Sequence, residues 1–186
     1  MNIDISVHLS KALKTAPNAS EFQKGALTSA VVGCAELVRE NFAKLDMERN
    51  RHGSHFYEQK GVDATSYKVG TDSGEIVVNS HEMAHKLRGG IVVPVRVKYL
   101  AIPLADKYFG KPPRAYGVGN GSPLRFVKGR SGKAVLIDKR SGEAAYALVR
   151  SVKHKPHPET IPGEAELSAR AKECVEDYLA AELGDV

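Results

Sequence analysis

The sequence is poor in the features that mark secreted or membrane-spanning proteins. It holds only two cysteines, Cys34 and Cys174, and neither belongs to a CxxC pair. No stretch of the chain approaches the ~18 consecutive apolar residues of a membrane span. The first residues show no basic region followed by an apolar one, so no signal peptide is expected. We therefore expect two buried thiols in a protein that is made in the cytoplasm and has no membrane partner.

Acidic residues are nearly missing from one long part of the chain. Between Lys86 and Lys155 there are 16 Lys and Arg against three acids, which gives a net charge of +13. The other residues hold 11 bases and 19 acids, a net charge of −8, and the stretch after Lys155 has two bases and eight acids. This split favours a polyanion partner, or self-association of an acidic end with a basic face. A solvated surface without a partner is the alternative.

No catalytic set can be assembled from the spacing of the residues. The spacing brings together neither a Ser/His/Asp set nor a Cys/His pair. No two carboxylates stand in an apolar setting. The glycine-rich stretch Gly117–Ser122 lacks a GK[ST] ending and runs into Pro123 and a strand-like segment. We interpret it as a flexible loop rather than a phosphate-binding loop. The sequence predicts no enzyme and no cofactor.

One segment does match a catalytic pattern. His81-Glu82-Met83-Ala84-His85 fits the H-E-x-x-H motif of zinc peptidases, which requires a stable helix and a third metal ligand. Gly89-Gly90 leaves room for barely two helical turns. The extended metzincin motif would need Gly at position 88 and His at position 91, where this chain has Arg88 and Ile91. We therefore interpret both histidines as ordinary surface residues and assign no metal ligand.

Two metal-binding interpretations nevertheless stay open. The first is a zinc peptidase built on His81 and His85. The second is a structural zinc site that also uses His52 and His55. Both need ligands that the spacing alone does not supply.

Hydrophobic periodicity predicts an α+β fold. Ile3, Ile5 and Val7 alternate with polar residues and indicate a short strand. A stretch that resembles a capping box begins at Ser20, and apolar residues three and four apart then predict a long helix to Met47. The face that we expect to be buried carries Leu27, Val31, Cys34, Val38, Phe42 and Leu45.

The rest of the chain predicts strands followed by a closing helix. The expected strands cover residues 66–70, 75–80, 91–104, 124–127, 134–138 and 144–152, and the helix runs from Gly163 to Leu183. We expect a single domain of residues 1–186, in which an antiparallel sheet of hairpins packs against both helices. Residues 105–123 are rich in turn formers and are expected to form a flexible loop.

Four sequence blocks carry a resemblance to a known family. They are RHGSHF at residues 51–56, KLRGGIVVP at 86–94, KYLAIPL at 98–104 and YALVRSVKHKPHPETIP at 146–162. In this order, between a long helix and a closing helix, they resemble the virion-morphogenesis family of neck and tail-completion proteins of tailed phages and prophages. The resemblance runs from about Ser20 onward and leaves out the first strand.

The resemblance implies a non-enzymatic virion protein that forms a ring at the head–tail joint, as a head-closure or tail-terminator subunit. Its partners would be copies of itself, portal or head-completion proteins, tail-tube proteins and packaged DNA bound without sequence preference. It would be made in the bacterial cytoplasm and end in the virion. The alternative from another class is a basic nucleic-acid-binding protein.

Candidate interface residues follow from this interpretation and from the charge split. For contacts between subunits we expect Arg88, Gly89, Gly90, Glu173, Glu176 and Asp177. For contacts with DNA or another polyanion we expect Lys86, Arg96, Lys98, Arg125, Lys128 and Arg130.

Overall fold

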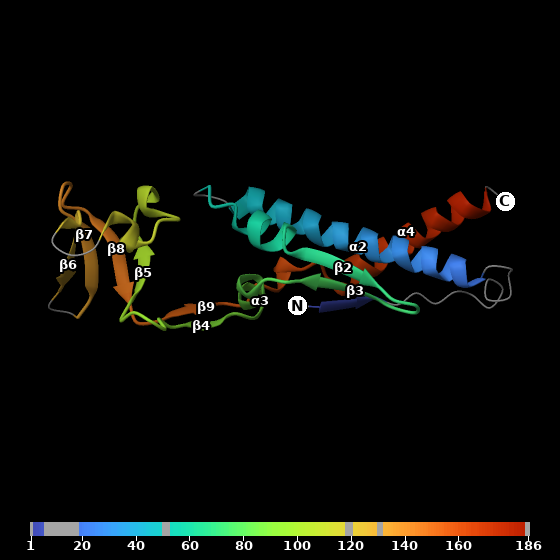
Figure 1. The fold of residues 1–186 in the computed structure, drawn as a ribbon, viewed down its shortest axis with the longest axis horizontal. Coiled ribbons are helices and arrows are strands. Elements are labelled where there is room, and N and C mark those ends of the chain that lie inside the picture. Colours follow the sequence, from blue (N-terminus) through green and yellow to red (C-terminus); the bar gives the residue numbers. More distant parts are fainter. Residues whose placement is uncertain (1, 6–18, 50–52, 118–120, 130–131, 185–186) are drawn as a thin grey trace. The chain divides into compact units, whose positions relative to one another are not determined.

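The chain folds into two compact units (Figure 1). The computed structural model describes residues 2–5, 19–49, 53–117, 121–129 and 132–184. Unit 1 comprises residues 1–50, 55–88 and 157–186, and unit 2 comprises residues 51–54 and 89–156. The sequence predicted a single domain of residues 1–186 from the length of the chain. Most of unit 2 lies between Arg88, where the chain leaves unit 1, and His157, where it returns.

Unit 1 packs helices on an antiparallel sheet, as the α+β prediction expected. Its helical elements are α2 (Ala19–Arg49), η1 (Glu58–Val62), α3 (His81–Arg88), η5 (Pro158–Thr160) and α4 (Glu164–Leu183). Its strands, in the order β1-β3-β2, are β1 (Asn2–Ile5), β2 (Thr65–Val69) and β3 (Gly74–Val78). The first strand thus follows the prediction to Ile5, and Val7 lies outside the described residues. None of the described helices is long and apolar enough to cross a lipid bilayer.

The buried face of α2 is the one that the periodicity predicted. Leu27, Val31, Cys34, Val38 and Phe42 are at most 1% exposed, and Leu45 is 5% exposed. They form two apolar clusters with Ile76 and Val78 of β3. A stripe of residues three and four apart stays on one side of a helix, so the sequence alone could locate this core.

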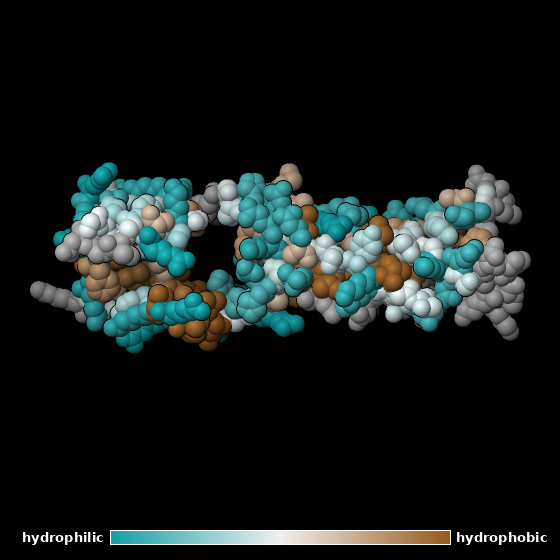
Figure 2. Space-filling view, in the orientation of Figure 1, coloured by the Kyte–Doolittle hydropathy of each residue, from teal (hydrophilic) through white to brown (hydrophobic). Residues whose placement is uncertain are grey.

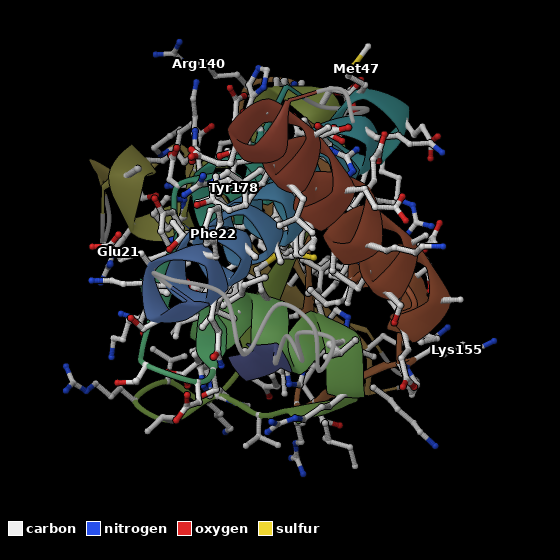
Figure 3. The ribbon with its side chains drawn as sticks, turned by 90° about the vertical axis from the view of Figure 1, so that its right-hand side faces the viewer. Glu21, Phe22, Met47, Arg140, Lys155 and Tyr178 are labelled. Carbon is white, nitrogen blue, oxygen red and sulfur yellow. The ribbon has the colours of Figure 1, made fainter. Side chains whose placement is uncertain are left out.

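Helix α4 crosses α2 at a row of small residues. Gly25, Ser29 and Gly33 follow one another every fourth position, and the Ser29 hydroxyl donates to the carbonyl of Cys174 at 2.9 Å. A Cβ at Gly25 would overlap the Tyr178 ring, and one at Gly33 would overlap the Cys174 sulfur. Figure 3 shows Tyr178 beside the first turns of α2, and Met47 projecting away from both helices. The absence of side chains at these two glycines lets the helices pack closely.

Unit 2 consists of two separate β-structures. Its strands are β4 (Gly90–Val92), β5 (Leu100–Pro103), β6 (Leu124–Lys128), β7 (Ala134–Asp138), β8 (Ala144–Val149) and β9 (Val152–His154). The antiparallel sheet has the order β5-β8-β7-β6, and β4 pairs with β9 in a two-stranded ribbon. The continuous strand predicted for residues 91–104 is wrong, because the ladder stops at Val92 and resumes at Leu100. Pro94 has no N–H to donate to such a ladder.

The segment expected to be a flexible loop is folded onto the sheet of unit 2 where the structure describes it. It contains the 3-10 helices η2 (Asp106–Tyr108) and η3 (Pro113–Tyr116). Tyr108 is 3% exposed and donates its hydroxyl to an Asp138 carboxylate oxygen at 2.8 Å. The Tyr146 hydroxyl donates to the Lys111 carbonyl, also at 2.8 Å. Two tyrosines therefore hold residues 105–117 to the sheet, and residues 118–120 lie outside the described part.

Candidate interaction surfaces

The H-E-x-x-H segment forms a helix, although a short one. Helix α3 begins directly after Ser80, whose hydroxyl accepts from the backbone N–H of Met83 at 3.2 Å. This is an N-cap, and the Met83 side chain is fully buried in the core around Phe42. The helix has eight residues and ends before Gly89, so the two turns that the sequence allowed are both formed.

Among the described residues, no third His, Cys, Asp or Glu joins His81 and His85 in a group of potential metal ligands. The Glu82 carboxylate lies 3.3 Å from the Lys60 ammonium. A backbone hydrogen bond at the start of α3 and the Lys60 ammonium lower the pKa of Glu82, which weakens it as a base. Among the residues that the structure describes, the only group of three side chains able to share a metal ion is Asp46, His55 and Glu58. That group brings in one of the two histidines named for a structural zinc site, and His52 lies outside the described residues.

Gly89 and Gly90 stand where unit 2 begins, and both have a positive φ, of +68° and +136°. A Cβ on Gly89 would lie 2.7 Å from the Pro156 nitrogen and 2.9 Å from the His154 carbonyl oxygen. The positive φ and these close contacts within the chain explain why glycine is needed at position 89. Arg88, the last residue of α3, is exposed.

Unit 2 carries an exposed aliphatic stripe that sequence reasoning interpreted only as strand. Ile91, Val93, Val95 and Val97 are 65%, 55%, 92% and 66% exposed. Figure 2 shows a hydrophobic patch over β4 and the connection to β5, where these residues lie. Only Ile91 belongs to β4, and residues 95–99 form bends, so what the four residues share is exposure along one short segment and not a straight strand. Contiguous exposed apolar patches mark interaction sites in soluble proteins.

The sheet of unit 2 bears a groove of about 680 Å³ on one face. Its lining is mainly apolar and includes Ala101, Leu136, Tyr146 and Leu148 from the strands and Tyr108 from η2. Three basic residues also line it, namely Lys98, Lys111 and Arg114. The hydroxyls of Tyr108 and Tyr146 donate hydrogen bonds within the chain, so it is their aromatic rings that face the groove. The groove therefore suits an apolar segment that carries negative charge.

The predicted polyanion-facing residues come from several segments of the chain. Arg96 and Lys98 are exposed in the segment of the stripe, and Arg125 and Lys128 are exposed on β6. Lys86 belongs to α3 in unit 1, where its ammonium lies 5.9 and 6.0 Å from the ring centroids of Phe56 and Tyr57. Arg130 lies outside the described residues.

Helix α4 exposes the three acids that were predicted to form an interface. Glu173, Glu176 and Asp177 all lie on its solvent-facing side. Glu173 pairs with Arg170 at 3.7 Å and Glu176 with Lys172 at 3.6 Å, both within the helix. Such exposed pairs are worth ~0.2–1 kcal/mol each, so they would rearrange readily for a partner.

No protein-family model, curated protein or solved structure matches this chain. The resemblance to the virion-morphogenesis family therefore rests on the sequence blocks quoted above.

Proposed function

We propose that this chain is a structural subunit of a tailed phage or prophage particle and forms a ring at the head–tail joint. The observation that carries the proposal is the stripe of Ile91, Val93, Val95 and Val97, whose side chains are more than half exposed. Exposing four aliphatic side chains to water costs ~25 cal/mol per Å² of apolar surface, and a neighbouring subunit would remove that cost.

The charge distribution supports contacts between unlike surfaces of neighbouring copies. Residues 89–156 hold 14 Lys and Arg against three acids, a net charge of +11. Helix α4 holds six acids against two bases, a net charge of −4. In a closed ring each copy presents one surface to the copy on one side and a different surface to the other. Opposite charges would steer this docking, and the apolar stripe would hold it.

The resemblance adds the place of assembly and the partners. A ring at the head–tail joint contacts a portal or head-completion protein on one side and a tail-tube protein on the other. The proposed location is therefore the virion, after synthesis in the bacterial cytoplasm. Packaged DNA would pass the ring and contact its basic residues without sequence preference.

A pair of matched substitutions tests the stripe. Val95→Asp places a charge on the most exposed residue of the stripe, and Met47→Asp does the same at a residue of unit 1 that is 88% exposed. We expect Val95→Asp to abolish ring formation and Met47→Asp to leave it intact, with both proteins folded. Sedimentation and negative-stain electron microscopy measure the rings, and circular dichroism checks the fold. Rings from the Val95→Asp protein would exclude the stripe as the subunit contact.

A second experiment addresses the acidic helix. Reversing the charge of Glu173, Glu176 and Asp177 together should leave the subunit folded, because all three are exposed. We expect slow or blocked joining of heads to tails, visible as separate heads and tails in lysates. Normal infectious particles from the triple variant would show that this face of α4 meets no partner.

The second candidate function is binding of nucleic acid, which the net charge of +11 in residues 89–156 favours. Release of counterions would give duplex binding at low salt, with a slope of about −0.9 per phosphate contacted in a plot of log K against log salt. We expect this binding to disappear at physiological salt. Sequence-specific binding that persists at physiological salt and is weakened by Arg125→Ala and Lys128→Ala would favour nucleic-acid binding over ring formation.

A further inference from the structure

The end of α2 and the start of η1 bring together three potential metal ligands. Asp46 lies in the last turns of α2, His55 lies between α2 and η1, and Glu58 begins η1. The His55 Nδ1 atom lies 3.2 Å from Asp46 Oδ2 and 3.1 Å from Glu58 Oε2. One ligand atom from each of the three residues lies within 4.8 Å of the other two.

From this arrangement we propose that Asp46, His55 and Glu58 bind a borderline divalent cation, Zn²⁺ in particular. Tetrahedral zinc holds its ligand atoms at about 2.0–2.1 Å, which places two of them about 3.3 Å apart. Both distances from His55 Nδ1 agree with that separation. One imidazole nitrogen with two carboxylates is a donor set that suits zinc better than the all-oxygen sites of magnesium and calcium.

The proton chemistry of the group also points to a cation. An imidazole nitrogen carries at most one proton, so the two carboxylates near Nδ1 face a single N–H. A metal ion in front of Nδ1 would instead neutralise both carboxylates at once.

The surroundings hold one ligand in place and leave space for the ion. Asp46 is 6% exposed, and its Oδ1 atom accepts from the N–H groups of Tyr57 at 2.9 Å and Glu58 at 3.4 Å. Its other oxygen is thereby oriented toward His55, as outer hydrogen bonds orient metal ligands in general. The three residues line a cavity of about 380 Å³, which accommodates an ion and its water ligands. Bound there, zinc would link the end of α2 to η1.

Calorimetric titration of the chelator-treated full chain with ZnCl2 tests the site. We expect one zinc per chain, and a loss of affinity of more than about tenfold for His55→Ala and for Glu58→Gln. Zinc should also raise the melting temperature of the unsubstituted protein and not that of Glu58→Gln. Glu58 is exposed, so its substitution tests the site even if His55→Ala fails to fold.

Two control variants make the test specific. His157 pairs with Glu159 at 3.0 Å and resembles the His55 pair, but belongs to no group of three ligands among the described residues. His157→Ala should therefore leave zinc affinity unchanged. The double variant His81→Ala/His85→Ala should do so too. No zinc binding by the unsubstituted chain, binding that survives Glu58→Gln, or binding lost in the His81/His85 variant would each overturn the proposal.

Discussion

The two units hold their structures by different means. Unit 1 buries a continuous row of aliphatic and aromatic side chains along α2, whereas the described core of unit 2 consists of Tyr108, Leu124, Ala145 and Tyr146. Unit 1 leaves few large apolar side chains exposed, and unit 2 exposes the stripe of Ile91, Val93, Val95 and Val97. The comparison indicates that unit 1 has the larger apolar core and that unit 2 has the larger exposed apolar surface, so we predict that substitutions in unit 1 cost the most stability.

The largest expected effect is the loss of the Phe42 ring from the core of unit 1. Phe42 is fully buried, so Phe42→Ala should lower the free energy of unfolding by ~3–5 kcal/mol, through lost burial and the cavity left behind. Met47→Ala on the same helix, at a residue that is 88% exposed, should change it by less than about 0.5 kcal/mol. Denaturant titration measures both. Equal effects of the two substitutions would contradict this prediction.

A smaller loss of stability is expected from a substitution in η1, where Gly61 contacts the Phe42 ring. A Cβ at Gly61 would lie 2.6 to 3.0 Å from three atoms of Phe42, so Gly61→Ala should cost ~1–3 kcal/mol of stability through overpacking. The same substitution in the Phe42→Ala protein should cost much less, because the methyl group then enters the cavity. The double-mutant cycle measures this coupling, and simple additivity would show that the two residues do not touch.

In unit 2 the contact to test is a hydrogen bond, whereas the contact of Gly61 with Phe42 in unit 1 is apolar packing. Tyr108→Phe removes the hydrogen bond to Asp138 and should lower the melting temperature less than Gly61→Ala does. Its main effect should be local, as faster hydrogen–deuterium exchange in residues 105–117. Exchange that is as slow as in the unsubstituted protein would show that the apolar contacts of the ring suffice to hold this segment.

The smallest effect concerns reactivity rather than stability. Burial raises the pKa of Cys34 to about 11, and it raises the pKa of the partly exposed Cys174 as well. At pH 8 both groups are therefore mainly neutral thiols, and only a thiolate reacts readily with iodoacetamide. We expect Cys174 to be alkylated before Cys34 in the folded protein, and both to react in denaturant, as measured by mass spectrometry. Faster labelling of Cys34 would show that the interior of unit 1 opens easily.

Much of unit 1 was predictable because its signals are local. The sequence predicted a helix and its buried face together, from the spacing of Leu27, Val31, Val38 and Phe42. The structure confirms both. The closing helix and the hairpin strands followed from periodicity and turn residues in the same way. Short-range patterns are sufficient to predict an element and its buried face where the element's own side chains determine which face is buried.

The surfaces were less predictable, because distant segments determine them. The sequence showed a β-branched run after Gly90, but nothing in the run indicated that Val95 would be 92% exposed. Likewise, the turn formers of residues 105–123 indicated a loop, and only the hydroxyls of Tyr108 and Tyr146 reveal that part of it is anchored. Whether a residue is exposed depends on which other segments cover it, and composition does not record that.

The sequence by itself determined the α+β class, the buried face of α2, the uneven charge and the need for glycine at position 89. These depend on periodicity, on composition and on backbone geometry at single residues. Only the tertiary structure decided the division into two units, the exposed stripe, and the meeting of Asp46 with His55 and Glu58. Each of these needs the chain to turn back on itself, and the positions at which two segments then meet are determined by packing.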